Sequence, residues 1–592
     1  MLLRYLPPAS KLACCLFDGF LGWPTEDVLA RIYEKMDESP AVAQHGQVMT
    51  KPHVVELILD LAGYDSTSCL AKKRLLEAGC GNGNFLVAAI RRLLGQCPDP
   101  AIPDSLERCI LGVEKDAKLA TEARKRIATE LTDYGFSKSA ANSLAKKWVV
   151  VADFLKLSLK EDFDFVIGNP PYVRQEAIDK KDLLFYRDTF ECFYDRADLY
   201  VVFLEKSLQL LARNGTLGVI CPNRFLRNRY GCKLRALITR NFHVRHAIDL
   251  AEASPFTPDV MAYPGIYVIS RTKTDQVNFF HMTTASQSEC AEVREALAKG
   301  NESVQNGVRY NKHTEWFSGD EPWVTESPAH LDLVRRLEDR FPTLGSKNSG
   351  TRVGIGVATG ADRVFIVESG FDEVEEELLL PLAVSGDCIS GNLQWHGSYV
   401  INPFKSVANS ELIDLAEFPK ARAYFERHEA LLRNRSVGKR NPLNWYRTID
   451  RITPSLLQRP KLLIPDIKSE GVCALDHGTC YPHHNLYYVV SDYWDLKALR
   501  TILRSSLARF FIWSYGVRMR NNYLRFQAQY LRRIPLPAVI ACSSPAIKKL
   551  AAMDDEVDLD RIDREVCRFY KLSDKDLEFM RMALNRKLDE TA

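Results

Sequence analysis

Short apolar runs alternate with longer helical patterns between residues 26 and 270, and this alternation restricts the fold more than any other feature. The strand-like runs are Arg74–Glu77, Cys109–Val113, Trp148–Val151, Phe163–Ile167, Leu217–Ile220 and Ile266–Ile269. Helical patterns such as Leu86–Leu94 and Leu199–Leu211 lie between them. Strands that alternate with helices predict an α/β fold with a mostly parallel sheet covered on both faces. Ligands of such sheets bind at the carboxyl ends of the strands, so functional residues are expected there.

The first strand ends in a glycine-rich turn, Glu77-Ala78-Gly79-Cys80-Gly81-Asn82-Gly83. Glycines let the backbone turn sharply and approach a ligand closely. A phosphate cradle needs amide donors and a lysine, whereas here the acidic Glu77 ends the strand. A carboxylate at this position suits a ligand with an ammonium group, such as the methionine part of S-adenosylmethionine. A plain strand-to-helix turn that happens to use glycine is the alternative interpretation.

Two further strands also end in an acidic residue. Glu114 follows Gly112-Val113, at a place where a carboxylate can accept protons from both ribose hydroxyls. Asp153 ends the next strand and can accept from an adenine amino group, while the ring of Phe154 offers a face to the base. Each acid alone is more often a solvated loop residue or a helix cap. Three acids at three successive strand ends indicate one binding site.

The fourth strand ends in Asn169-Pro170-Pro171-Tyr172. The exocyclic amino group of an aromatic base is a poor nucleophile, because its lone pair is delocalised into the ring. Two acceptors aimed at its hydrogens raise its reactivity; Asn169 offers a side-chain carbonyl and Pro170 a backbone carbonyl. The prolines preorganise both acceptors, and Tyr172 offers a ring on which a planar substrate can stack. A rigid Pro-Pro turn that merely closes the strand is the alternative.

This order of motifs resembles the gamma-class adenine-N6 DNA methyltransferases of restriction–modification systems, from about Gly46 to the end of the chain. The resemblance implies a class I S-adenosylmethionine-dependent methyltransferase domain, with a mostly parallel seven-stranded sheet between helices, and a mixed α+β target recognition domain. It implies that S-adenosyl-L-methionine is bound by Thr50, Glu77, Gly79, Gly81, Glu114, Asp153 and Phe154. In the family a proline often follows the threonine directly, whereas Lys51 intervenes here.

The family flips its target adenine out of the duplex. The resemblance implies that Asn169, Pro170, Pro171 and Tyr172 are catalytic and that Tyr172 stacks on the flipped base. Phe256 is the best candidate for a second stacking contact, and a core or loop phenylalanine is the alternative. Asp198 is open to two interpretations, as a contact to cofactor or substrate and as the N-cap of the helix that follows it.

The C-terminal half carries an uneven charge. Residues 421–540 hold 20 Lys and Arg but only 8 Asp and Glu, whereas the whole chain has a net charge of +3. Seven arginines and no acid lie between Arg504 and Arg533, mixed with aromatic and amide side chains. Basic residues neutralise phosphates, and arginine and amide groups read base edges, although a charge run is usually a solvated face. The residues predicted to contact DNA are Arg433, Arg435, Lys439, Arg440, Arg518, Arg520 and Arg525.

These features predict five segments. They are an N-terminal segment (1–40), the methyltransferase domain (41–280), a connecting segment or insertion (281–350), the target recognition domain (351–545) and a C-terminal helical segment (546–592). Val353–Asp362, Lys461–Asp466 and Tyr530–Pro537 resemble parts of the recognition domain of the same family.

The predicted function is therefore site-specific methylation of adenine N6 in double-stranded DNA. One alternative is the same Asn-Pro-Pro-Tyr chemistry on guanine N2 of RNA or on a protein glutamine. A fused restriction–modification enzyme is disfavoured because no nuclease motif is evident, and a DNA-binding module with a degenerate pocket is disfavoured because the motifs are intact. We expect a monomer, with a companion restriction endonuclease or defence-system subunits as further partners.

Composition excludes several other classes of protein. No run of about 18 apolar residues is present, so no membrane span is expected. The first residues lack the features of a cleaved signal peptide, which favours a cytoplasmic protein. The chain has 15 cysteines but no Cys-x-x-Cys pair, so reduced thiols and no metal site are expected.

Overall fold

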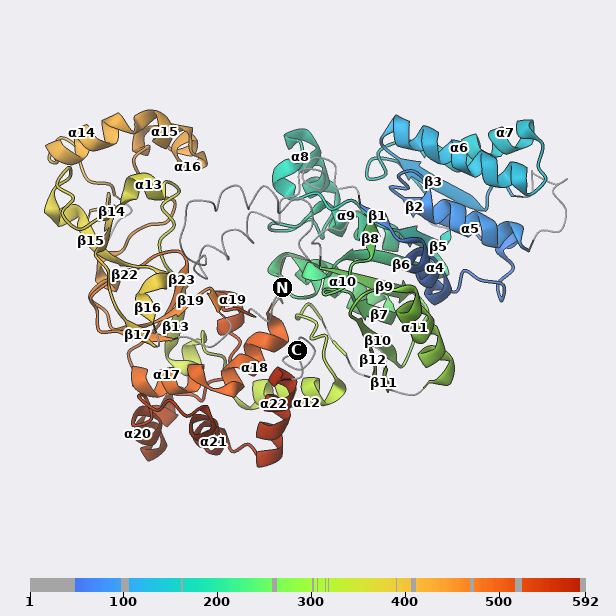
Figure 1. Cartoon of the computed structure of the whole chain (residues 1–592). Coiled ribbons are helices and arrows are strands. Elements are labelled where there is room, and N and C mark those ends of the chain that lie inside the picture. Colours follow the sequence, from blue (N-terminus) through green and yellow to red (C-terminus); the bar gives the residue numbers. More distant parts are fainter. Residues whose placement is uncertain are drawn as a thin grey trace, which may run out of the picture. The chain divides into compact units, whose positions relative to one another are not determined.

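The computed structural model shows two regions in one chain, and each region is built around β-sheet (Figure 1). The structure describes residues 48–96, 106–160, 163–257, 263–300, 303–305, 307–314, 316–317, 319–389, 391–405, 411–468, 473–516 and 524–585. The predicted N-terminal segment, residues 1–40, lies outside the described residues.

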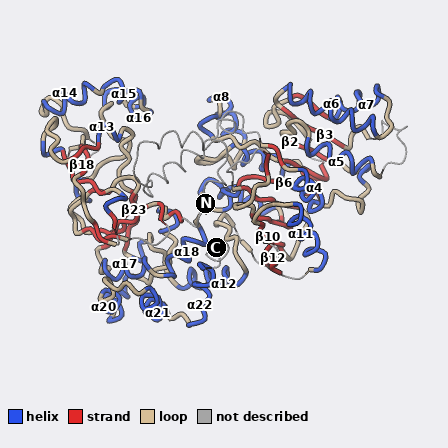
Figure 2. Tube along the Cα trace, in the orientation of Figure 1, coloured by secondary structure: helices blue, strands red, loops and turns tan. Residues whose placement is uncertain are grey.

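A ten-stranded sheet organises the first region, and strands and helices alternate along it (Figure 2). In spatial order its strands are β11 (Ser303–Gln305), β12 (Val308–His313), β10 (Val277–Met282), β7 (His243–Asp249), β9 (Pro264–Ser270), β6 (Leu211–Pro222), β5 (Phe163–Gly168), β2 (Leu75–Ala78), β3 (Ile110–Glu114) and β4 (Val149–Val151). The seven strands from β7 to β4 all run the same way except β9, which pairs antiparallel with both β6 and β7. The expected seven-stranded, mostly parallel sheet is therefore present.

Three more strands extend this sheet beyond β7. Strand β10 pairs parallel with β7, β12 pairs antiparallel with β10, and β11 pairs antiparallel with β12. Helix α11 (Gln287–Lys299) connects β10 to β11. Residues 281–313 were expected to belong to a connecting segment or insertion, but here they continue the sheet. Their polar composition hid this, because buried side chains such as Val308 and Tyr310 of β12 alternate with the partly exposed Arg309 and Asn311.

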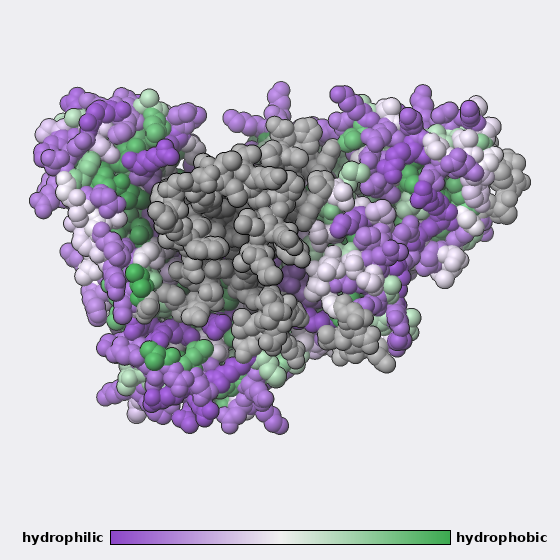
Figure 3. Space-filling view, in the orientation of Figure 1, coloured by the Kyte–Doolittle hydropathy of each residue, from purple (hydrophilic) through white to green (hydrophobic). Residues whose placement is uncertain are grey.

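Two apolar cores cover the two faces of the sheet. Along β5, Phe165 and Ile167 belong to one core and Val166 to the other, as the two-residue period of a strand requires. The helices of the first core are α4 (Pro52–Ala62), α5 (Asn84–Leu94), α6 (Ala117–Asp133), α7 (Lys138–Trp148) and α11; those of the second include α9 (Leu199–Gln209) and α10 (Cys232–Asn241). The surface over α6 and α7 is mainly hydrophilic, as expected for helices with one apolar side (Figure 3).

The second region contains two smaller sheets and several helices. Its six-stranded sheet has the order β13 (Thr351–Ile355), β23 (Leu486–Ser491), β19 (Lys461–Pro465), β21 (Ala474–Asp476), β17 (Asn392–Leu393) and β16 (Cys388–Ile389). Its four-stranded sheet has the order β14 (Ile366–Glu368), β18 (Ser398–Ile401), β15 (Leu379–Ala383) and β22 (Tyr481–Pro482). This combination of helices with largely antiparallel sheets agrees with the α+β character expected for the second region.

The last described part of the chain is mainly helical. Its longer helices are α17 (Leu496–Arg504), α18 (Ser506–Tyr515), α20 (Pro545–Ala551), α21 (Leu559–Tyr570) and α22 (Asp574–Asn585). Helix α12 (Pro328–Arg340), from the expected connecting segment, packs against them: the His330 ring stacks on Phe510 at 4.1 Å and its Nε2 lies 2.7 Å from Ser514 Oγ. This second half of the segment is thus a packed helix rather than a linker.

Candidate active site

A pocket of about 620 Å³ lies at the carboxyl ends of β2, β3, β4 and β5. All three acidic strand ends contribute to its wall, as do Asn169 and Pro171 of the Asn-Pro-Pro-Tyr segment, whereas Pro170 and Tyr172 are not among its lining residues. The predicted site residues that line it are Thr50, Glu77, Gly79, Gly81, Glu114, Asp153, Phe154, Asn169 and Pro171. Parallel strands end at one edge of a sheet, which is why residues so far apart in the chain meet here.

The glycine turn between β2 and α5 has a backbone that favours glycine. Gly79, Gly81 and Gly83 have φ values of 73°, 55° and 87°. A Cβ built on Gly81 would meet no atom within 4 Å, so this glycine faces open space in the pocket wall. From behind, Arg126 donates to the carbonyl of Asn82 at 2.9 Å and fixes the turn.

Glu77 is a buried carboxylate beside this turn, with 2 % of its surface exposed. It accepts a hydrogen bond at 3.1 Å from the amide of Leu86, in the first turn of α5. Burial raises the pKa of Glu77 well above its usual value, and the nearby carboxylate of Glu114 raises it further. A cation placed in the pocket would relieve both effects.

Glu114 is held by two backbone amides. Its Oε2 accepts from Gly81 at 2.7 Å and its Oε1 from Asp116 at 2.8 Å. Asp116 caps α6 by accepting from the amides of Lys118 and Leu119. Each oxygen of Glu114 keeps a second lone pair, so the carboxylate can also accept from a diol in the pocket.

Asp153 has partners on both carboxylate oxygens. The amide of Leu155 donates to Oδ1 at 3.1 Å, and Lys115 Nζ lies 3.1 Å from Oδ2. The Tyr186 hydroxyl, from α8 (Lys180–Thr189), donates to Oδ2 at 3.4 Å. Lys115 and Tyr186 were not predicted as site residues, because nothing in the local sequence shows that α8 folds over this strand end.

Phe154 forms the apolar floor next to Asp153. Its ring packs against Phe203 of α9 with 5.2 Å between centroids. Lys206, one turn further along α9, donates to the carbonyls of Phe154, Leu155 and Leu157. The segment after β4 is therefore fixed to α9 by three hydrogen bonds.

Asn169 is oriented by a segment far from it in sequence. Its Nδ2 donates to the carbonyl of Val48 at 3.1 Å and to Thr50 Oγ1 at 3.3 Å. A carbonyl can only accept, so Val48 fixes which side of the amide is nitrogen. The opposite atom, Oδ1, is buried and has no hydrogen-bond partner among the described residues. The role of Val48 is carried by its backbone, which leaves no sequence signal.

Tyr172 and Phe256 lie side by side. Their rings form an edge-to-face pair with 6.0 Å between centroids, and Phe256 lies opposite Thr50 in the pairing of β1 (Met49–Thr50) with β8 (Phe256–Thr257). Phe256 is only 1 % exposed. In this conformation its ring supports Tyr172 and does not offer a face to a base, which agrees with the core interpretation rather than the stacking one.

Asp198 precedes α9 but does not cap it, since its side chain makes no capping hydrogen bond. The amide of the next residue, Leu199, instead donates to the carbonyl of Val173 at 2.9 Å. Burial raises the pKa of Asp198 to about 6, against the opposing charges of Arg224 and Arg174. Asp198 thus occupies the N-cap position of α9, and its carbonyl accepts from the Val201 amide at 3.1 Å, but its side chain does not cap the helix.

The residues predicted to contact DNA separate into two groups. Arg433, Lys439 and Arg440 are exposed, on α15 (Glu429–Asn434) and α16 (Ser436–Arg440), although Arg433 also pairs with Glu429 at 2.6 Å and donates to the Pro442 carbonyl at 2.7 Å. Arg435 instead donates to the carbonyls of Leu432, Thr359, Trp445 and Arg447. Four of its five N–H groups are thereby used inside the fold, so the structure gives Arg435 a structural role rather than a DNA contact.

The arginines between residues 504 and 533 are likewise mostly paired. Arg525 forms an ion pair with Asp466, and Arg533 forms one with Glu338 at 2.8 Å. Arg504 and Arg532 donate to backbone carbonyls. Arg518 and Arg520 lie outside the described residues. Two arginines of the acid-free stretch therefore form ion pairs with acidic residues from other segments.

Comparisons with known proteins agree with this geometry. The family described as Eco57I restriction-modification methylase matches residues 86–256, and the TaqI-like C-terminal specificity domain matches residues 386–536. The chain is 43% identical over 558 residues to the type II methyltransferase M.BstVI of Geobacillus stearothermophilus, an alignment that covers 91% of this chain and 98% of the relative. It is 41% identical to the type II methyltransferase M.PaeR7I of Pseudomonas aeruginosa, covering 89% and 92%.

A solved structure shares the fold. The type IIL restriction-modification enzyme MmeI, determined in complex with DNA, superposes with a TM-score of 0.55 at 13% identity, covering 93% of this chain and 76% of that one. Among the described residues, no helix combines the length and apolar character needed to cross a membrane.

Proposed function

Because the chain belongs to the type II DNA methyltransferases of restriction–modification systems, we propose that it methylates N6 of a flipped-out adenine in double-stranded DNA. The observation that carries this choice of atom is the buried Oδ1 of Asn169, which has no hydrogen-bond partner among the described residues. An unpaired buried acceptor is unfavourable, so the site favours a ligand that brings an N–H donor to it.

Asn169 and Pro170 supply two acceptors for the two hydrogens of the exocyclic amino group. Their carbonyl oxygens draw the nitrogen toward tetrahedral geometry and stabilise the positive charge that develops on it. No general base with a special pKa is required, because the proton leaves readily once the nitrogen is alkylated. Tyr172 presents its ring to the planar base, and Phe256 supports Tyr172 from the side.

The methyl donor is S-adenosyl-L-methionine, which supplies an activated methyl group on sulfur when bound. The pocket fits its three parts: a buried acid for the ammonium, an acid with free lone pairs for the ribose, and an acid with an aromatic neighbour for the adenine. We assign these roles to Glu77, Glu114 and Asp153 with Phe154. Gly79 and Gly81 leave room for the ligand. Thr50 Oγ1 accepts a hydrogen bond from Asn169 Nδ2, which connects the cofactor pocket to Asn169.

Sequence selection is assigned to residues 351–545, the proposed target recognition domain, in which the TaqI-like specificity domain falls. The exposed Arg433, Lys439 and Arg440 are the proposed phosphate contacts, together with Arg518 and Arg520 outside the described residues. We further propose that the enzyme acts as a cytoplasmic monomer beside a companion restriction endonuclease or other defence subunits.

The test is incubation of the purified protein with methyl-labelled S-adenosylmethionine and plasmid DNA, followed by nucleoside analysis. We expect the label in N6-methyl-2′-deoxyadenosine from the DNA. Label in cytosine would refute the proposed target atom, and label only in added RNA or protein would refute DNA as the substrate. Sequencing of DNA from expressing cells then identifies the recognition site.

A further inference from the structure

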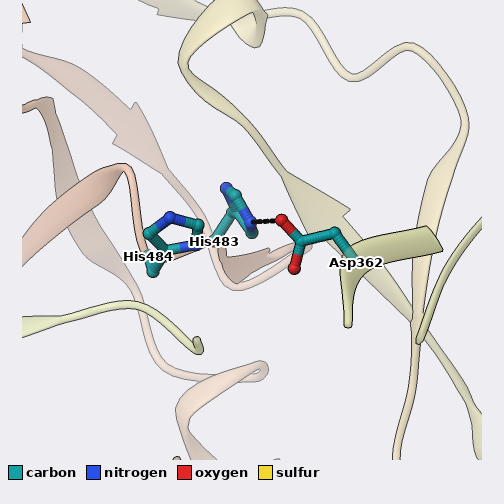
Figure 4. A group of neighbouring side chains, drawn as sticks. All are labelled: Asp362, His483 and His484. Carbon is teal, nitrogen blue, oxygen red and sulfur yellow. Dashed lines mark ion pairs between the residues drawn. The ribbon is translucent and has the colours of Figure 1, made fainter. Parts of the chain in front are cut away.

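A second cluster of polar side chains lies in the second region, away from the pocket described above (Figure 4). It contains Asp362, the first residue of α13 (Asp362–Phe365), and His483 and His484, which follow β22. One ligating atom from each of the three side chains lies within 4.8 Å of the others. Two imidazoles and a carboxylate are a common set of metal ligands.

The backbone holds both histidines firmly. The His483 amide donates to the carbonyl of Ala383 at 2.9 Å, and the His484 amide donates to the carbonyl of Val357 at 3.0 Å. Val357 and His483 also form a parallel bridge. A Cβ at Gly356 would lie 2.2 Å from the carbonyl oxygen of His483, so the loop after β13 approaches this turn very closely. The cluster is therefore preorganised by the fold.

His483 is a buried residue whose ring has no hydrogen bond. It is 7 % exposed, and neither Nδ1 nor Nε2 has a hydrogen-bond partner among the described residues. Its Nε2 is aimed at Asp362 Oδ2, 3.5 Å away (Figure 4). The 3.5 Å contact with Asp362 does not meet the geometry of a good hydrogen bond, so an ion placed between the two groups would satisfy both of them.

Asp362 is prepared to bind a cation. Its Oδ1 accepts from the hydroxyl of Thr359, which leaves Oδ2 toward His483. An aspartate carboxylate is ionised at neutral pH, so Asp362 can supply an anionic ligand.

The distances fit a small ion. Ligands about 2.0–2.1 Å from a tetrahedral metal lie about 3.3 Å from one another. The 3.5 Å between His483 Nε2 and Asp362 Oδ2 is close to this value. The ligand atom of the exposed His484 lies within 4.8 Å of the other two, which places a third donor beside the pair.

We propose that Asp362, His483 and His484 bind a divalent transition-metal ion of the zinc class, with water at the remaining position. Nitrogen ligands favour such ions over magnesium and calcium, which prefer all-oxygen sites. Both imidazoles are neutral when they bind a metal, so the three ligands together carry the single negative charge of Asp362. This charge suits one divalent cation.

The ion would have a structural role in the recognition domain. It would join the loop that follows β13 to the turn between β22 and β23. The same loop contacts the basic segment, because the Thr359 carbonyl accepts from both Arg435 and the amide of Ile449. Metal binding would thus stabilise the surface that carries Arg433 and Arg440.

The test uses the full chain after treatment with a chelator and dialysis. Zn²⁺ is titrated by calorimetry, and Co²⁺ is titrated by visible absorption, which distinguishes nitrogen and oxygen ligands from the thiols of the chain. We expect one site, d–d bands without a sulfur-to-cobalt charge-transfer band, and a higher melting temperature with Zn²⁺. His484→Ala and Asp362→Asn should each weaken binding by about 10- to 100-fold or more.

The matched control is His477→Ala, an exposed histidine on the preceding turn, which should bind as the unmodified protein does. Circular dichroism verifies that the variants are folded. Absence of a site, a thiolate spectrum, or equal affinity in the His484 and Asp362 variants would overturn the proposal. These measurements need no methyl transfer, so they are independent of the proposed activity.

Discussion

Replacement of Asn169 by alanine tests the proposed chemistry most directly. Asn169 lines the pocket, and its buried Oδ1 has no hydrogen-bond partner in the part of the chain that the structure describes, while its Nδ2 donates to Val48 and Thr50. Loss of a preorganised hydrogen bond to developing charge typically costs about 10²–10³ in kcat, or about 2.7–4 kcal/mol. We therefore expect Asn169→Ala to lower the methyl-transfer rate by about 100- to 1,000-fold.

Thr50→Val tests the hydrogen bond that orients Asn169, and it is the milder of the two changes. Valine keeps the shape of threonine but removes the acceptor 3.3 Å from Asn169 Nδ2. A neutral hydrogen bond contributes about 0.5–1.5 kcal/mol, so the rate should fall by about 2- to 13-fold. The carbonyl of Val48 still orients the amide, which is why the expected effect is smaller.

Both rates should be measured in single turnovers at saturating cofactor and duplex DNA, with separate binding titrations for each ligand. Asn169→Ala should bind S-adenosylmethionine nearly as well as the unmodified enzyme. The reasoning is refuted if Asn169→Ala keeps more than about a tenth of the rate, or if Thr50→Val is the more damaging change.

Three further predictions concern charge. Burial raises the pKa of Glu77, so the affinity for the cofactor should strengthen as the pH rises through that pKa. Calorimetry should find that Glu77→Gln binds the cofactor more weakly and without this pH dependence. An unchanged pH profile in Glu77→Gln would contradict the ammonium contact. The pKa of Asp198 is raised from 3.8 to about 6, so the stability tied to its protonated form is complete below about pH 4 and lost as pH rises through 6. Asp198→Asn should therefore stabilise the fold at pH 8 by about 1–3 kcal/mol and little at pH 4, as measured by denaturant unfolding; equal effects at both pH values would count against it. Arg435→Ala should lower the free energy of unfolding by about 2–4 kcal/mol because four carbonyls lose their donor. The exposed Arg440→Ala should leave stability within about 0.5 kcal/mol and instead weaken DNA binding with a shallower salt slope; the reverse pattern would exchange their roles.

The positions of the pocket residues follow largely from the sequence. Glu77, Glu114, Asp153 and Asn169 each come directly after a short apolar run, and parallel strands place their carboxyl ends at one edge of the sheet. Apolar periodicity is a local property that survives without knowledge of the rest of the chain. Strand β7, by contrast, begins with the polar sequence His243-Val244-Arg245-His246, and its local pattern is too weak to predict a strand.

Other features depended on contacts between distant segments. Arg525 and Arg533 lie in a stretch without acids, yet they pair with Asp466 and Glu338, 59 and 195 positions away. Phe256 could be placed near the site, but only the pairing of β1 with β8 shows that its ring is buried. The sequence by itself determined strands β2 to β6 and β9 and the acids at the ends of β2, β3 and β4, because those depend on local periodicity. The tertiary structure decided which charges are left for DNA, because an ion pair depends on distance in space and leaves no pattern along the chain.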